Sequence, residues 1–238
     1  RQEPGNRYAH ERGQFCCDAS DAHREGQRSP QIIHGLATVL TALMGVPLAW
    51  FLARTEFRGK SIVDSLLTVP IILPPTVVGY LLILLLGVQS PIGVVLNSRF
   101  GFRMLFTEGA AVLAAVVVAF PLLLIPARAA FADIERELED MARLMGAGPL
   151  RLFWHVSLPL ARRGIAGGLL LAFARSLGEF GATVMVFGVT RKTLPILIWY
   201  ENESSSLSAA APAVCVLLVV SLSVIFIFHR AGFARRER

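Results

Sequence analysis

The sequence predicts an all-α membrane protein with about five transmembrane helices, and two observations carry that prediction. Of the 238 residues, 54% are hydrophobic and 17% are charged, whereas soluble domains average about 25% charged residues. Several apolar runs also approach or exceed the roughly 20 residues that a helix needs to cross a bilayer. The net charge of +6 does not indicate nucleic-acid binding, because the charges lie between the apolar runs.

The apolar runs contain residues that shape membrane helices. They cover residues 32–53, 61–86, 109–127, 164–188 and 209–228. The fourth run contains Gly164, Gly167 and Gly168, small residues that let two membrane helices approach closely. Between the runs we expect a loop over 87–108, with room for a short interfacial helix, and a polar connection over 189–208.

Prolines interrupt the second run at Pro70, Pro74 and Pro75. Proline removes a backbone donor and clashes with the preceding turn, and lipid tolerates such a break only where it faces protein or a water-lined cavity. We therefore expect a kinked helix that is packed inside the protein. Two interpretations stay open: Pro74 and Pro75 line a translocation path, or they form a purely structural kink.

Basic residues are unevenly divided between the two sides of the membrane. With five spans, residues 54–60, 128–163 and the tail from 230 share one side and hold thirteen Lys or Arg, whereas residues 87–108 and 189–208 hold four. Cytoplasmic loops carry the excess of Lys and Arg in membrane proteins. The first side is therefore predicted to be cytoplasmic.

One charged stretch, residues 133–159, is unsuited to lipid and is predicted to form a loop in water. Its five Asp and Glu residues all precede Met141, and we interpret them as the solvated face of a helix. Glycine accepts backbone angles that other residues avoid, so Gly146 and Gly148 predict two short helices that meet at a bend. A solvated loop without a partner is one interpretation of this stretch, and a docking site for another protein is the other.

Arg175 and Glu179 are the charged residues inside the fourth run. Four residues apart on a helix, they share a face and can form an ion pair. A charge at the bilayer centre costs roughly 2.5–3.5 kcal/mol on insertion scales, so such residues usually face the protein interior. Either the pair belongs to a path or gate, or it locks the packing of helices.

The stretch 133–159 resembles the cytoplasmic signature of bacterial ABC-importer permeases. That signature runs Glu-Ala-Ala, three residues, Gly, nine residues, Ile, one residue, Leu-Pro. Its positions are held here by Asp140, Met141, Ala142, Gly146, Val156, Leu158 and Pro159. Asp140, Met141 and Val156 depart from the usual residues. Similarity to the molybdate/tungstate permeases is found in residues 45–49, 54, 59–61, 69–80 and 173–183, and the resemblance runs from about residue 32 to 229.

The resemblance implies a type I ABC importer permease whose coupling loop, 133–159, binds an ABC ATPase subunit. The loop would offer a partner apolar and basic side chains: Met141, Leu144, Met145, Leu150 and Leu152, with Arg143 and Arg151 at the rim. It also implies a homodimer in the bacterial inner membrane and an external oxyanion-binding protein. Arg175 and Glu179, with Pro74 and Pro75, become candidates for the oxyanion path or gate. ATP would be bound by the partner, so no cofactor, metal or catalytic residue is expected in this chain.

The implied function is ATP-driven import of an oxyanion, molybdate or tungstate, by alternating access. The sulfate/thiosulfate permeases have similar sequence blocks and are the alternative. An ion-driven secondary transporter would need intramembrane ion sites and often has inverted repeats, whereas this chain shows one charged pair and no repeat. A membrane-bound enzyme would need a catalytic motif, and the sequence offers no candidate active site.

Three regions are expected along the chain. Residues 1–29 are polar, with five Arg balanced by five Asp or Glu, and are expected to be disordered. With five spans, this tail would lie on the side of the membrane opposite the cytoplasm. Residues 30–230 form the transmembrane domain. Residues 231–238 form a basic cytoplasmic tail.

Overall fold

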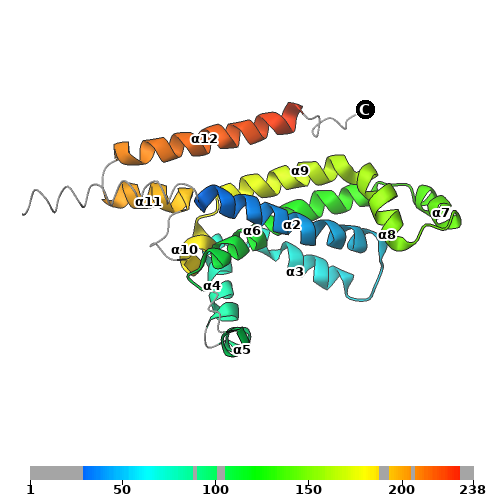
Figure 1. Cartoon of the computed structure of the whole chain (residues 1–238), viewed down its shortest axis with the longest axis horizontal. Coiled ribbons are helices and arrows are strands. Elements are labelled where there is room, and N and C mark those ends of the chain that lie inside the picture. Colours follow the sequence, from blue (N-terminus) through cyan, green and yellow to red (C-terminus); the bar gives the residue numbers. More distant parts are fainter. Residues whose placement is uncertain (1–28, 88–89, 101–104, 188–192, 205–206, 231–238) are drawn as a thin grey trace, which may run out of the picture.

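The fold is known from a computed structural model that describes residues 29–87, 90–100, 105–187, 193–204 and 207–230 (Figure 1). Every regular element in these ranges is helical, which confirms the predicted all-α class. The elements are α2 (Ser29–Arg54), α3 (Lys60–Ile72), α4 (Pro75–Leu86), α5 (Pro91–Phe100), α6 (Glu108–Ala132), α7 (Arg136–Leu144), α8 (Pro149–Leu152), the π-helix η1 (Phe153–Ser157), α9 (Leu158–Leu177), α10 (Gly181–Phe187), α11 (Leu194–Ser204) and α12 (Leu207–Arg230). The predictions for residues 1–28, 231–238 and Gly188 lie outside the described residues, whereas Ser29, which was assigned to the disordered tail, is the first residue of α2.

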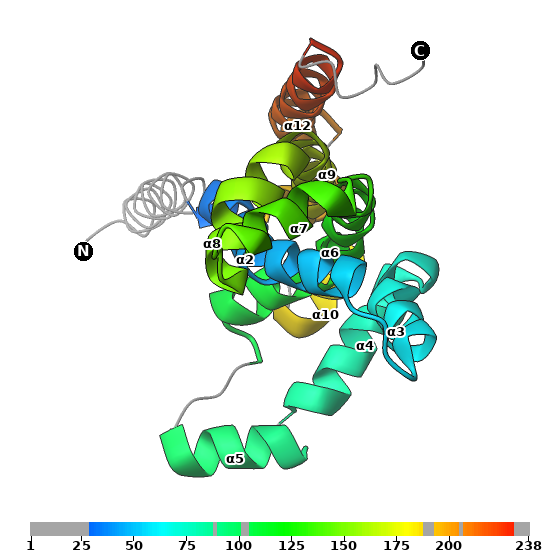
Figure 2. The ribbon, with the colours of Figure 1, turned by 90° about the vertical axis from the view of Figure 1, so that its right-hand side faces the viewer.

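Helix α6 forms the centre of the fold, and it is buried along most of its length. Its N-terminus is capped by Thr107, whose side chain accepts a hydrogen bond from the Ala110 backbone N–H. Helices α2 and α9 pack against α6, and the three form a bundle with α3, α4 and α5 on one side and α12 on the opposite side (Figure 2). The largest buried cluster joins these three helices and includes Leu52, Leu123, Phe131 and Ile165.

The close approach of α6 and α9 depends on two glycines. A Cβ atom at Gly168 would lie 2.9 Å from Pro126 Cγ and 3.1 Å from the carbonyl oxygen of Leu123. A Cβ at Gly164 would collide with the Cβ of Ala130. The small residues of the fourth run therefore allow close helix packing, as predicted.

Three of the described helical segments are long and apolar enough to cross a bilayer: Ile33–Arg54, Glu108–Ala132 and Pro149–Leu177. Two shorter apolar helices, Pro75–Leu86 and Ala211–Ile227, belong to the second and fifth predicted runs. The described part of every predicted run is mainly helical, but two runs are each divided into two helices rather than one. Leu73 is extended between α3 and α4, and residues 178–180 separate α9 from α10.

The ends of the runs also differ from the sequence prediction. Helical structure resumes at Pro149 and continues through η1 into α9, so Arg162 and Arg163, predicted to precede the span, lie within α9 and are exposed. The connection 87–108 contains the short helix α5, for which the prediction left room, whereas α11 in the polar connection 189–208 was not predicted. Pro159 lies inside this continuous helix and has no backbone N–H to donate to the preceding turn. The π-helix η1, which ends at Ser157, is the kind of local adjustment by which a helix accommodates such a proline.

Candidate functional site

Helices α7 and α8 lie at one end of the molecule, beside the C-terminal ends of α2 and α6 and the beginning of α9 (Figure 1). Helix α12 runs toward the same end and finishes at Arg230. The described parts of the three basic segments therefore lie on one side of the fold, as the charge count predicted.

Two ion pairs lie at this end of the fold. Arg128 Nη1 lies 2.5 Å from Asp64 Oδ1, and Lys60 Nζ lies 2.7 Å from Glu56 Oε1. The hydrogen bond from Lys60 lowers the pKa of the Glu56 carboxyl.

Gly146 makes the bend between α7 and α8. Its φ angle is 86°, in the left-handed region that favours glycine. The Gly146 N–H donates to the carbonyl oxygen of Arg143 at 2.9 Å, and the Ala147 N–H donates to that of Ala142 at 3.0 Å. These two bonds form a Schellman motif, which satisfies the last carbonyl groups of α7. The predicted bend and the short helix before it, α7, are confirmed, whereas the helix after the bend continues from α8 through η1 into α9.

Helix α7 and the residues that follow it expose their large apolar side chains. Leu144 is 88% exposed, Met145 83% and Leu150, on α8, 74%. Together with Leu138 and Met141, they form what we call the docking surface. A helix at the surface of a protein normally buries its apolar face against the core, so this inverted arrangement is typical of an interaction surface.

The other residues of the predicted contact set differ in position. Leu152 is buried in the core, so the prediction that it offers apolar contact to a partner is wrong. Ala142 is also buried, where it holds α7 against the fold. Asp140 is exposed and forms an ion pair of 3.0 Å with Arg143. Three signature residues that follow lie at the start of the long helix: Val156 and Leu158 are half-buried and Pro159 is exposed.

Glu139 is buried, which corrects its interpretation as part of a solvated acidic face. Its Oε1 atom accepts hydrogen bonds from Arg54 Nε at 3.1 Å, from Arg54 Nη2 at 2.8 Å and from Ser157 Oγ at 2.8 Å. Burying a carboxylate without such partners would be very costly, and the three donors explain how this one is accommodated. Neither Arg54 nor Ser157 was singled out as a functional residue from the sequence.

The two broken spans meet at their breaks, at the other end of the bundle. A Cβ atom at Gly181, the first residue of α10, would lie 2.9 Å from Pro75 Cβ and 3.2 Å from the Thr76 backbone nitrogen. Gly79 of α4 approaches Ala182 and Met185 of α10 with similar closeness. The structure thus places Pro75 against the segment that follows Glu179, so two separately predicted parts of the candidate path lie together.

Arg175 and Glu179 form the predicted ion pair. Arg175 Nη1 donates to Glu179 Oε2 at 2.6 Å, and the backbone N–H of Ala182 donates to Glu179 Oε1 at 2.8 Å. Glu179 thereby also supports the first turn of α10. The side chain of Glu179 is 1% exposed and that of Arg175 is 32% exposed, so the arginine is the member of the pair that reaches accessible space.

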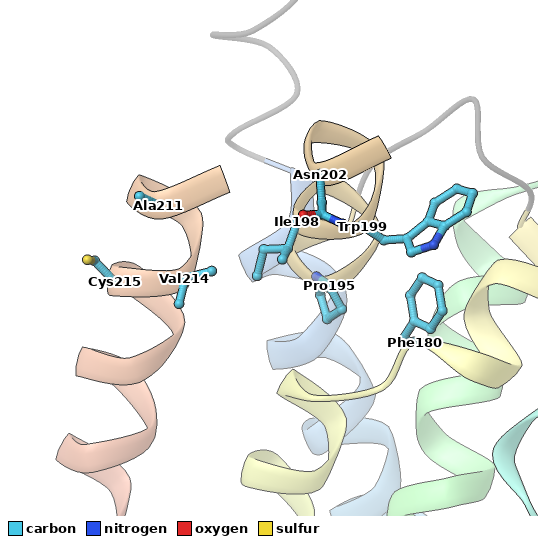
Figure 3. Close-up of a pocket in the computed structure, with 8 residues that line it drawn as sticks. All are labelled: Phe180, Pro195, Ile198, Trp199, Asn202, Ala211, Val214 and Cys215. Atoms are coloured by element: carbon cyan, nitrogen blue, oxygen red, sulfur yellow. The ribbon is translucent and has the colours of Figure 1, made fainter. Parts of the chain in front are cut away.

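A hollow of about 620 Å³ lies between α11, α12 and Phe180 (Figure 3). Its lining is almost wholly apolar: Phe180, Pro195, Ile198, Trp199, Asn202, Ala211, Val214 and Cys215. Among the residues that the structure describes, only Asn202 brings a side-chain amide to the hollow, and no charged side chain lines it. A charged ligand would lose its hydration there without replacement, so this hollow does not suit an anion.

Comparison with known proteins places these features in a family. Residues 45–236 match the family described as binding-protein-dependent transport system inner membrane component. The chain is 39% identical over 210 residues to the molybdenum transport system permease protein ModB of Escherichia coli K12, covering 87% of this chain and 91% of that protein. It is 41% identical over 198 residues to a probable molybdenum ABC transporter permease protein of Haloferax volcanii, covering 83% and 71%.

A further relative and two solved structures extend the comparison. The molybdate/tungstate transport system permease protein WtpB of Pyrococcus abyssi is 32% identical over 205 residues, covering 86% of this chain and 77% of that protein. The fold resembles a chain of a bacterial alginate ABC transporter with a TM-score of 0.69 at 16% identity, covering 86% and 76% of the two chains. It resembles a chain of the inward-facing MetNI methionine ABC transporter with a TM-score of 0.67 at 15% identity, covering 90% and 95%.

Proposed function

Since the chain belongs to the family of binding-protein-dependent transport system inner membrane components, we propose that it is the membrane-spanning subunit of an ATP-driven ABC importer for an oxyanion, molybdate or tungstate. The chain is a transport component, and ATP hydrolysis belongs to a separate subunit. The names of its relatives favour molybdate and tungstate over the sulfate alternative. One structural observation carries the assignment to this chain's own residues: the exposed apolar face of α7 and α8.

The docking surface is the site at which the ATPase subunit binds, and it faces the cytoplasm. Support for this orientation comes from the basic residues that gather at the same end of the fold and from the direction of α12. The binding protein would then deliver the oxyanion at the opposite end, near α5 and α11. ATP is bound by the partner subunit, and no cofactor is assigned to this chain.

Replacing Leu144 with aspartate is expected to weaken binding of the ATPase subunit by about tenfold or more, because the few residues that dominate an interface contribute about 2 kcal/mol or more each and Leu144 is the most exposed of the docking surface. The fold should persist, since Leu144 is 88% exposed. The measurement is copurification of the ATPase subunit with the detergent-extracted chain. Glu137→Gln, an exposed change on the same helix, is the control. Equal copurification of Leu144→Asp and the control would place the ATPase elsewhere.

Replacing Gly146 with valine is expected to misalign α7 and α8. A non-glycine residue in the left-handed region costs roughly 1–2 kcal/mol, which shifts the population of the correct bend by about 5- to 30-fold. No atom lies within 4 Å of the position that the new Cβ would occupy, so the effect comes from backbone strain and not from a clash. Molybdate uptake and ATPase copurification should fall while membrane insertion is retained.

Gly148→Val provides the matched control for Gly146→Val. Gly148 has a φ of −68° and a ψ of 166°, an extended conformation that valine adopts readily, and its surroundings are equally open. If the two valine variants lose transport to the same extent, the left-handed bend is not the reason for the loss at Gly146.

The oxyanion path is proposed to pass Arg175, near the crossing of α4 and α10. Arg175 supplies the positive charge, and Glu179, which is buried and also bonded to the backbone of Ala182, holds the arginine in place. This assignment combines the two interpretations of the pair: Glu179 is structural, and Arg175 contacts the passing anion. Pro74 and Pro75 break the neighbouring span and bring its backbone to the same level.

A second copy of the chain is proposed to complete the path. Helix α3 buries none of its residues within one chain and exposes Ile62, Leu66 and Ile72. An apolar helix in this state needs either lipid or a second subunit around it, and a path between two copies would use such a face. The stoichiometry of the purified complex, two copies of this chain with two ATPase subunits, is the corresponding measurement.

A further inference from the structure

We propose that Glu139 is the positioning residue through which movement of the docking surface reaches the membrane helices, an inference that rests on the proposed function of that surface. The one-sided arrangement of α7 leads to this assignment. Within the described chain, Glu139 and Ala142 are the buried residues of α7, and its remaining side chains are exposed. Apart from the backbone at its two ends, α7 therefore transmits a force to the rest of the protein mainly through the carboxylate of Glu139 and the methyl group of Ala142.

The carboxylate of Glu139 is bonded to the ends of two membrane helices. Arg54, which gives two of the three bonds, is the last residue of α2. Ser157, which gives the third, is the last residue of the π-helix that continues into α9. Arg54 Nη2 also lies 3.4 Å from the carbonyl oxygen of Ile134, just beyond α6. One acidic side chain thus connects α7 with the ends of α2 and α9 and, through Arg54, with the chain leaving α6.

Burial makes this connection stiffer than an ordinary surface ion pair. The side chains of Glu139 and Arg54 are 3% and 10% exposed, whereas the neighbouring pair of Asp140 and Arg143 is 63% and 55% exposed. The two side chains of an exposed ion pair separate easily, since water can hydrate each of them, and the pair contributes little to stability. A buried pair cannot separate without leaving an uncompensated charge in the protein interior. Glu139 and Arg54 are therefore held together whenever α7 moves.

The other side of the connection is a packed aromatic cluster. The ring of Phe153, on η1, lies 5.3 Å from that of Trp50 on α2 and 6.3 Å from that of Phe131 on α6. Close-packed interiors transmit displacement instead of absorbing it. A force on Glu139 consequently reaches α2 and α9 at a point where both helices are braced against α6. The π-helix, a feature that often occurs at functional sites, brings Ser157 into this position.

The test compares Glu139→Gln with Glu137→Gln in the complete importer reconstituted in vesicles with the ATPase subunit and a molybdate-loaded binding protein. Both variants replace a carboxylate by an amide on α7, but only Glu139 is buried. For Glu139→Gln we expect normal copurification of the ATPase subunit and continued ATP hydrolysis. We expect molybdate transported per ATP hydrolysed to fall by about tenfold, within the usual range of coupling between linked sites. Glu137→Gln should behave as the parent protein.

A milder variant keeps the test decisive if Glu139→Gln fails to fold. Arg54→Lys retains the charge of the pair but not the second donor, and it should lower the transport-to-ATP ratio less than Glu139→Gln does. The proposal is overturned if transport and ATP hydrolysis fall in equal proportion in either folded variant, because that result describes a merely structural residue. An unchanged ratio in both variants also overturns it. Absence of any ATPase bound to the parent chain would instead refute the proposed function.

Discussion

Replacing Gly168 with leucine is expected to lower the thermal midpoint of the protein and the amount of folded protein recovered from the membrane. The new side chain would start 2.9 Å from Pro126 Cγ and 3.1 Å from a backbone oxygen of α6, which cannot rotate away as a side chain can. Overpacking a core typically costs 1–3 kcal/mol, and occasionally more, against a total stability of about 5–15 kcal/mol. We expect the cost at this site to lie at the high end of that range, since one of the two nearest atoms belongs to the backbone of α6.

Gly35→Leu is the control for Gly168→Leu. Gly35 also lies in a spanning helix, α2, but nothing lies within 4 Å of the position of its Cβ. The measurement is the amount of monodisperse protein after detergent extraction, together with its thermal midpoint. Similar yields and midpoints for the two variants would mean that α6 and α9 do not approach as closely as described.

Replacing Arg175 with glutamine is expected to reduce molybdate uptake by roughly 10- to 100-fold while the complex still assembles. A hydrogen bond to a charged group contributes about 1.5–3 kcal/mol, and the passing oxyanion would lose such a bond. Arg175→Lys keeps the charge and should retain more uptake than Arg175→Gln. The measurement is uptake in vesicles, normalised to the amount of assembled complex and to its basal ATP hydrolysis.

The same pair of variants tests whether Arg175 is only structural. A residue that merely locks α9 to α10 would act through its bond to Glu179, so glutamine would lower the thermal midpoint and the yield of complex along with uptake. Loss of yield in parallel with uptake would therefore assign the pair to helix packing. Intact uptake in Arg175→Gln would exclude the arginine from the path.

Much of the architecture could be predicted because its causes are local. The apolar runs, the bend at Gly146 and the pairing of Arg175 with Glu179 each follow from residues within one or two helical turns. The close packing at Gly168 followed from residue size alone. The breaks at residues 73 and 178–180 were harder to place, since proline and glycine weaken a helix without fixing where tertiary packing will divide it.

The burial of Glu139 could not be predicted by the same reasoning. Its partners Arg54 and Ser157 are 85 and 18 residues away, so no local pattern connects them. Leu152 was misassigned for the related reason that its exposure depends on α8 turning back onto the core. One signal was available: Leu138, Met141 and Met145 share a helix face, which places Glu139 and Ala142 on another. Polarity does not indicate which of these two faces packs against the fold, because the apolar face is the exposed one.

The meeting of the two helix breaks has a mechanical consequence. Helices resist bending through their repeated backbone hydrogen bonds, and Pro74 and Pro75 have no N–H to contribute. Helices α4 and α10 pack together through Gly79 and Gly181. Non-helical residues join each of them to the preceding helix: residues 73–74 join α3 to α4, and residues 178–180 join α9 to α10. Helices α4 and α10 therefore form a small pivoted block that rests on the alanine- and valine-rich first half of α6. Tilting it would break fewer bonds than bending two continuous spans.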